Sequence, residues 1–240
     1  MQTPQNNRLS PSASAARHDT AAQRPDDARW ICRVLPASGA LRQPWRNGGG
    51  ITHQIAVWPP AAQGGDLIWR ISTADVAQPG SFSNWDGFER QLWVTHGAGM
   101  RLTDPASGVV TLLRQGMSLD FPGERRYACD LLEGPVRDLN VMLRRGHGAI
   151  RSARLCGAHT VDLGTGHTII YCVRGSAQVR VADSRSTALA AGDALLVQQA
   201  TATDRPRQAV IHGQDSTTEC IAIALDCGTP LPPDPALPGK

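Results

Sequence analysis

The chain has 240 residues, of which 41% are hydrophobic, and 24 basic residues nearly balance 21 acidic ones to leave a net charge of +3. This length is enough for one large β domain or two small ones with a buried core. The near-neutral charge gives no reason to expect a nucleic acid or an anionic membrane as a partner. No run is apolar enough to span a bilayer and no signal-like segment follows Met1, so a cytoplasmic protein is expected.

The composition changes at both ends of the chain. Residues 1–28 are rich in Gln, Ser, Ala and Pro, and they are expected to form a disordered leader. Residues 228–240 contain five prolines and are expected to form a tail. The six cysteines form no Cys-x-x-Cys pair, so free thiols in a reducing compartment are expected.

Between these ends, helix signals are nearly absent and short strand signals recur, with Gly, Pro or Asp between them. An all-β chain is therefore predicted. The predicted strands are 30–35, 51–58, 67–74, 90–94, 100–103, 109–113, 117–121, 127–132 and 138–144.

Three of these strands alternate in a way that predicts two different faces. In the strand 51–58, one face carries Ile51, His53, Ile55 and Val57, and the other carries Thr52, Gln54 and Ala56. In the strand 67–74, the faces are Leu67, Trp69 and Ile71 against Ile68, Arg70 and Ser72. In the strand 138–144, they are Leu139, Val141 and Leu143 against Asp138, Asn140, Met142 and Arg144.

A faint internal repeat indicates two related halves. Residues 90–102 are echoed by residues 168–180, so that Gly97 corresponds to Gly175. A strand, a Gly turn, a second strand and then a Gly that precedes another strand is the local pattern of a cupin barrel. The predicted halves are residues 29–150, which carry the motifs below, and residues 151–227.

The stretch 44–57 contains three successive glycines, Gly48, Gly49 and Gly50, between Trp45-Arg46-Asn47 and Thr52. Glycines are useful where the chain takes φ > 0 or approaches another group closely, with backbone N–H donors directed outward. Arg, Asn and Thr side chains beside them suit an oxygen-rich small molecule. A tight Asn-Gly turn into a strand is the alternative.

Four blocks in order resemble the HutD/Ves family: residues 45–52, 69–74, 80–90 and 138–145. The resemblance runs from about residue 30 to residue 225, although after Arg151 it holds only in outline. It departs at Arg46, where Lys is common, at Asn84-Trp85, and at Glu89, where Asp is common. The resemblance implies an all-β, cupin-like (RmlC-like jelly-roll) bicupin fold. It also implies a small-molecule-binding accessory or regulatory role in bacterial histidine utilisation.

In such a barrel one face of every strand looks inward, and inward polar faces would line a cavity suited to a carboxylate. The predicted ligand-binding residues are Trp45, Arg46, Asn47, Gly48, Gly49, Gly50, Thr52, Arg70, Ser72, Ser83, Arg90, Asp138, Asn140 and Arg144. Two alternatives stay open: Arg70 and Arg144 could lie on a solvated face, and an Arg–Asp pair could simply close the loop 82–90. Trp45, Trp69 and Trp93 are better explained by core packing than by ligand stacking.

Three functions remain. The favoured one is a cytoplasmic protein that binds a small carboxylate, such as a histidine-degradation intermediate, with no metal or other cofactor, because the chain has no His-x-His pair. The second is a metal-free hydrolase or isomerase with Asp138 or His53 as base, and the third is an interaction scaffold. A homodimer is left open.

Overall fold

The computed structural model describes residues 30–45, 48–60, 63–182, 184–199 and 208–227. The predicted leader and tail therefore lie outside the described residues. Within these ranges the chain is built of strands, with one short 3-10 turn, η2 (Ala37–Gly39). None of the described segments forms a helix that is long and apolar enough to cross a membrane.

The strands form four antiparallel sheets, a large and a small one in each half of the chain. In hydrogen-bonded order, the N-terminal large sheet contains β2 (Leu41–Pro44), β3 (Gly50–Trp58), β4 (Trp69–Val76), β11 (Val136–Arg144), β6 (Phe88–His96) and β9 (Ser118–Pro122). The N-terminal small sheet contains β5 (Gly80–Ser81), β10 (Ala128–Leu131), β7 (Met100–Thr103) and β8 (Val110–Leu113).

The C-terminal half repeats this arrangement. Its large sheet contains β1 (Trp30–Leu35), β17 (Ala194–Gln199), β14 (His167–Arg174), β19 (Glu219–Leu225) and β12 (Ile150–Cys156). Its small sheet contains β13 (Ala158–Asp162), β18 (Gln208–Gly213), β15 (Ser176–Val181) and β16 (Thr187–Ala190).

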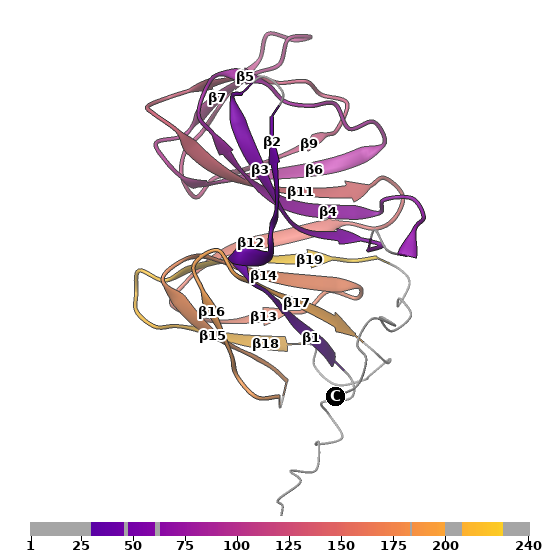
Figure 1. Ribbon diagram of the computed structural model, residues 1–240, viewed down its shortest axis with the longest axis vertical. Coiled ribbons are helices and arrows are strands. Elements are labelled where there is room, and N and C mark those ends of the chain that lie inside the picture. The colour runs from indigo at the N-terminus through magenta and orange to yellow at the C-terminus, as the bar shows by residue number, and fades with distance from the viewer. Residues whose placement is uncertain (1–29, 46–47, 61–62, 183, 200–207, 228–240) are drawn as a thin grey trace, which may run out of the picture.

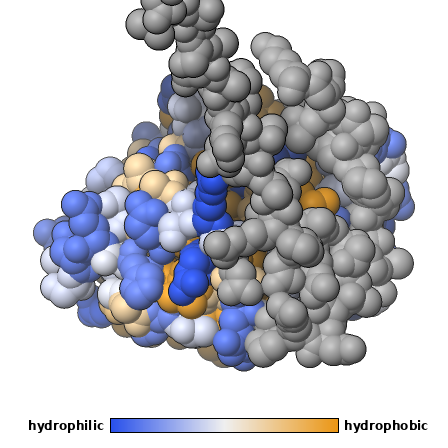
Figure 2. Space-filling view, turned by 90° about the horizontal axis from the view of Figure 1, so that it is seen from below, coloured by the Kyte–Doolittle hydropathy of each residue, from blue (hydrophilic) through white to orange (hydrophobic). Residues whose placement is uncertain are grey.

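Each half is a sandwich, and the two sandwiches stack with their large sheets facing each other (Figure 1). One hydrophobic core fills each sandwich and a third core lies between the large sheets. The end formed by the C-terminal half mixes hydrophilic residues with smaller hydrophobic areas where described residues are visible (Figure 2). The predicted all-β fold with two related halves is confirmed.

The first strand departs from the predicted division of the chain. β1 pairs along its whole length with β17, from Trp30 opposite Gln199 to Leu35 opposite Ala194. The sheet of the C-terminal half therefore contains residues predicted for the half 29–150. Asp193 supports the crossing to β2, because its Oδ1 accepts a hydrogen bond from the Ala37 N–H at 2.9 Å. Alternation reveals that a segment is a strand, but it does not reveal the strand's partner.

The core between the large sheets explains the alternation of β4 and β11. Trp69 is fully buried there, and its Nε1 donates to Nδ1 of His167 on β14 at 3.3 Å. The Trp58 ring lies 5.2 Å from the same imidazole. Burial lowers the pKa of His167 to about 4, so this imidazole is neutral at physiological pH. Trp69 and Trp93 pack in this core, as predicted.

β3 contains a bulge that overturns part of the predicted face pattern. The register with β4 shifts between Gln54 and Ala56, so one extra residue is inserted at Ile55. Thr52 and Gln54 face away from the core between the halves, as expected from their alternation. Ala56, predicted to share their face, instead packs in that core. A bulge reverses the face of every later residue in the strand, and alternation alone cannot locate it.

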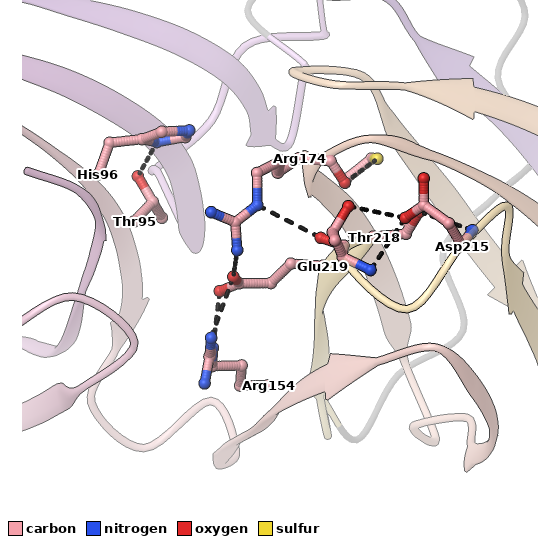
Figure 3. A network of polar contacts seen from close by, with 9 residues as sticks. Thr95, His96, Arg154, Arg174, Asp215, Thr218 and Glu219 are labelled. Carbon is pink, nitrogen blue, oxygen red and sulfur yellow. Dashed lines mark hydrogen bonds and ion pairs between the residues drawn. The ribbon is translucent and has the colours of Figure 1, made fainter.

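Beyond the apolar core, a buried carboxylate holds together three strands of the C-terminal large sheet. Glu219 is 1% exposed and accepts hydrogen bonds from Arg154 at 2.7 and 3.1 Å and from Arg174 at 3.0 Å. Figure 3 shows the two guanidinium groups reaching Glu219 from β12 and β14. The Arg154 side chain also lies against Gly116, where an added Cβ would come within 3.0 Å of its guanidinium. The cluster therefore lies where the two halves meet.

We expect Glu219→Gln to lower the free energy of unfolding by about 1–3 kcal/mol, because the charged acceptor of both arginines is lost. Both arginines are partly exposed and stay hydrated in the variant, which keeps the loss below that of a fully buried pair. Denaturant unfolding followed by circular dichroism measures the effect. A loss of less than about 0.5 kcal/mol would show that this cluster adds nothing to stability.

Candidate functional site

The N-terminal sandwich encloses a cavity of about 280 Å³ between its large and small sheets. Polar side chains of β4 and β11 form its floor, and Cys129 of β10 lies across from them. Trp45 and the loop that carries Ser83 and Trp85 complete its wall. The site is therefore assembled from seven separate segments of the sequence.

Strand register arranges the floor in rows. Each row takes one residue from β4, one from β11 and one from β6. In order along the strands, the rows are Arg70–Met142–Arg90, Ser72–Asn140–Leu92 and Ala74–Asp138–Val94. Alternate residues on a strand point to the same face, so neighbouring rows are about 7 Å apart. The rows show how the predicted polar faces of two strands come together on one surface.

Arg90 is a buried cation that organises the site. Its Nε and Nη2 donate to Oδ1 of Asn140 at 3.3 and 2.8 Å, and its Nη1 donates to the Ser83 carbonyl at 3.1 Å. The Phe121 and Phe82 rings flank the guanidinium at 4.8 and 5.5 Å. Burial lowers the pKa of Arg90 to about 10, which leaves it charged at neutral pH.

These contacts have two consequences. The Asn140 carbonyl is occupied twice by Arg90, which leaves its NH₂ group as a donor at the cavity. The predicted alternative, a loop closed by an Arg–Asp pair, is wrong, because Arg90 holds the Ser83 carbonyl instead. Asp86 accepts a hydrogen bond from Asn84 at 2.8 Å.

Arg70 is the second cation of the cavity. Its Nε donates to Gln54 at 3.0 Å, its Nη2 donates to Gln43 at 3.1 Å, and the guanidinium lies 5.4 Å from the Trp85 ring. Among the described residues no carboxylate lies within ion-pair distance of it. Two neutral amides and an aromatic face thus fix its orientation and leave its charge available to an anion.

Asp138 is fully buried, and neither carboxylate oxygen completes a hydrogen bond with a described residue. Burial raises the pKa of Asp138 to about 7, and the charge of Arg90 opposes this rise. The Asn140 amide and the Ala74 N–H also oppose it from nearby, but neither of these two donors completes a hydrogen bond of good geometry with the carboxylate. Burial beside Asp138 also raises the pKa of Cys129 to about 12, so that thiol stays protonated.

The glycine stretch supports the cavity wall. The Trp45 indole donates to the Thr52 hydroxyl at 2.9 Å, and an added Cβ on Gly50 would lie 3.1 Å from the Trp45 ring and 2.5 Å from the Asp75 carbonyl. Gly48 takes φ +70 and its N–H donates to the Trp45 carbonyl at 3.0 Å. The Gly49 carbonyl accepts from the Ala77 N–H at 2.9 Å.

The structure brings eight of the predicted ligand-binding residues to the cavity and places four others outside its lining. Those at the cavity are Trp45, Thr52, Arg70, Ser72, Ser83, Arg90, Asp138 and Asn140. Gly48, Gly49, Gly50 and Arg144 are described but are not part of its lining. Arg46 and Asn47 lie outside the described residues.

Arg144 and His53 have structural partners away from the cavity. Arg144 donates through Nε to the Leu67 carbonyl at 2.7 Å and covers the Phe88 ring. His53 lies on the opposite face of β3 from Thr52, where its Nε2 is 3.0 Å from Asp75. His53 is therefore not placed to act as a base on a molecule in the cavity.

Several lining residues were not predicted. Gln54, which accepts a hydrogen bond from Arg70 but does not line the cavity, shares a face with Thr52, so alternation could have indicated it. Gln43, Trp85 and Cys129 come from an edge strand, a loop and the opposite sheet, and no local pattern links them to the floor. Within the described ranges, no three His, Cys, Asp or Glu side chains are grouped so that they could hold a metal ion.

Two stacked β-sandwiches, with a polar cavity inside the first, define a bicupin protein. The chain belongs to the HutD family, whose sequence profile matches residues 37–214.

A conserved protein of unknown function from Pseudomonas aeruginosa PAO1 has a similar structure, with a TM-score of 0.71 and 26% identity over 83% of this chain and 100% of that one. HutD from Pseudomonas fluorescens SBW25 is similar at a TM-score of 0.66 and 26% identity, over 81% of this chain and 99% of that one. A protein from the hutC 3′ region of Pseudomonas putida is 37% identical over 46% of this chain, and the match spans 57% of that relative's length.

Proposed function

We propose that this chain binds a small carboxylate directly through the side chains of its N-terminal cavity. The observation that carries the proposal is Arg70, which is held by Gln43 and Gln54 and has no carboxylate partner among the described residues. A guanidinium fixed in this way suits recognition of a carboxylate. The Ser72 hydroxyl lines the same floor, so it can donate to the same anion, and the Asn140 NH₂ group lies beside it, near Asp138.

The charge balance supports a singly charged anion at this end of the cavity. Arg70 and Arg90 contribute two positive charges, and Asp138 contributes one negative charge when it is ionised. The ionised site is left with one positive charge, so a monocarboxylate would neutralise it. Buried charges are stable when they are neutralised and hydrogen-bonded, which favours an occupied cavity.

The pathway part of the proposal is an accessory or regulatory role in histidine utilisation, without a metal or other cofactor. It is supported by family membership and by relatives named for HutD and for the hutC region. The ligand is then a carboxylate intermediate of histidine degradation, and the protein is proposed to act in the cytoplasm.

A thermal-shift screen tests the proposal directly. Histidine, urocanate, formiminoglutamate, formylglutamate, glutamate and formate are titrated, because a ligand that binds the native state raises the melting temperature with its concentration. Each compound that binds is then incubated with the protein and assayed for turnover. Recovery of unchanged ligand supports an accessory role, and the absence of any shift across the series contradicts carboxylate binding.

Arg70→Ala is expected to weaken binding of the best carboxylate by tenfold or more, since a charge-assisted contact contributes about 1.5–3 kcal/mol. Its melting temperature without ligand should change little, because the hydrogen bonds of Arg70 are at the half-buried rim. Calorimetric titration measures the affinity. Arg101→Ala, an exposed arginine on β7, is the matched control and should bind normally. Equal affinities in the two variants would contradict a role for Arg70.

A second function, a hydrolase or isomerase, is favoured by one observation. Asp138 is a cavity carboxylate whose pKa burial raises to about 7, which is the range suited to a general base. Consumption of a ligand in the turnover assay, together with its loss in Asp138→Asn, would establish this alternative.

A further inference from the structure

Asp138 is not explained by the binding of a simple carboxylate. A negative charge in the same cavity repels an anionic ligand, and burial of a carboxylate without hydrogen bonds is costly. Asp138 is 0% exposed, and both of its oxygens lack a completed hydrogen bond. A protein that needed only to hold an anion would be more stable with a neutral residue here.

Arg90 does not supply the missing partner. Its three nitrogens donate to the Asn140 side chain and the Ser83 carbonyl. It pairs across the sheet with Met142, which lies two rows from Asp138. The Arg90 charge therefore acts on Asp138 only through space, and Asp138 keeps its capacity to accept hydrogen bonds at the floor of the cavity.

The rows of the floor separate two chemically different ends. Ser72 and Asn140 form a middle row of donors, with the Arg70 row about 7 Å to one side of it and the Asp138 row about 7 Å to the other. The Arg70 side chain reaches back toward the middle row, where its Nε donates to Gln54, the residue opposite Ser72. The lining also contains Ala74, Val76 and Met142, which are apolar. This arrangement matches a molecule with a carboxylate, a short apolar segment and a hydrogen-bond donor.

We propose that the cavity selects carboxylates that carry an N–H donor at their other end, with the carboxylate at Arg70 and the N–H group at Asp138. This inference rests on the proposed function, because it assumes that Arg70 holds the carboxylate. It assigns Asp138 a positive role in recognition: the ligand's nitrogen supplies the hydrogen bonds that no described residue completes. A charge-assisted contact between this nitrogen and a desolvated carboxylate is stronger than a neutral one.

A matched pair of ligands tests the inference in the full-length protein. δ-Aminovalerate and caproate have nearly the same length and the same carboxylate, but the first ends in an ammonium group and the second in a methyl group. Calorimetric titration should show that δ-aminovalerate binds at least about tenfold more tightly to the wild type. In Asp138→Asn this ratio should fall close to one, while the affinity for caproate stays the same or improves.

The outcomes separate this inference from the proposed function. Equal binding of both ligands, weakened for both by Arg70→Ala, would overturn the inference and leave carboxylate binding intact. A preference for δ-aminovalerate that persists in Asp138→Asn would also overturn it, because the donor would then be recognised elsewhere. If neither ligand binds, the inference fails, and the six-compound thermal-shift screen decides separately whether the cavity binds carboxylates. The wild-type comparison needs no variant, so it does not depend on how Asp138→Asn folds.

Discussion

Replacement of Trp69 by alanine is expected to lower the free energy of unfolding by about 3–5 kcal/mol, the usual cost of truncating a fully buried tryptophan. Trp69 is 0% exposed at the centre of the core between the two large sheets. The substitution leaves a cavity and also leaves Nδ1 of the buried His167 without its donor. Denaturant unfolding followed by far-ultraviolet circular dichroism measures the loss.

Trp85→Ala is the matched control for Trp69→Ala. Trp85 is partly exposed at the cavity rim, where it contacts Phe88 and Arg70. Its truncation should cost about 1 kcal/mol and weaken ligand binding, whereas Trp69→Ala should mainly reduce stability. Equal losses of stability in the two variants would mean that the contact between the halves is not a principal source of stability.

The local alternation in the sequence was sufficient to predict the central strands of the fold. In β4 and β11, Trp69, Ile71, Leu139 and Val141 alternate with polar residues, and the structure places these two sets on opposite faces as predicted. The partner of β1 and the bulge at Ile55 were not predictable in this way. Both depend on contacts between residues far apart in the chain, which local periodicity does not encode.

The same limit applies to the candidate site. Alternation within a single strand identifies the polar residues that share one face of it, as it does for Arg70 with Ser72 on β4 and for Asp138 with Asn140 on β11. The lining residue Cys129 comes from the opposite sheet, so only the closure of the sandwich brings it to the cavity. Arg144 shares the predicted face but lies at the end of β11, where the Leu67 carbonyl binds it. The polar face of a strand can thus be predicted from the sequence more readily than how far along that strand the cavity extends.

Asp138→Asn is expected to stabilise the protein at pH 8 and to have little effect near pH 4.5. Burial raises the pKa of Asp138 from an ordinary value of 3.8 to about 7, so the folded protein holds this proton more tightly than the unfolded chain does. Stability is therefore lost as pH rises from about 4 through about 7, by a total on the order of 4 kcal/mol. Asparagine carries no charge and avoids that loss.

The difference in unfolding free energy between variant and wild type isolates this effect. Arg90 and Cys129 lie near Asp138, and the charge of Asp75 acts on it from the other face of the sheet. Groups such as Asp226, whose pKa the Arg151 pair lowers, lose their contribution at acid pH. These terms are common to both proteins and cancel in the difference. Asp130→Asn, which removes an exposed carboxylate on β10, is the control.

A difference that does not grow between pH 5 and pH 8 would mean that Asp138 is already satisfied in the folded protein. The proposed need for a donor from the ligand would then lose its physical basis. A difference that grows, combined with loss of the preference for δ-aminovalerate in Asp138→Asn, would show that the chain keeps a destabilising carboxylate for recognition. A residue that lowers the stability of the folded protein at a binding site is expected where function, not folding, selects that residue.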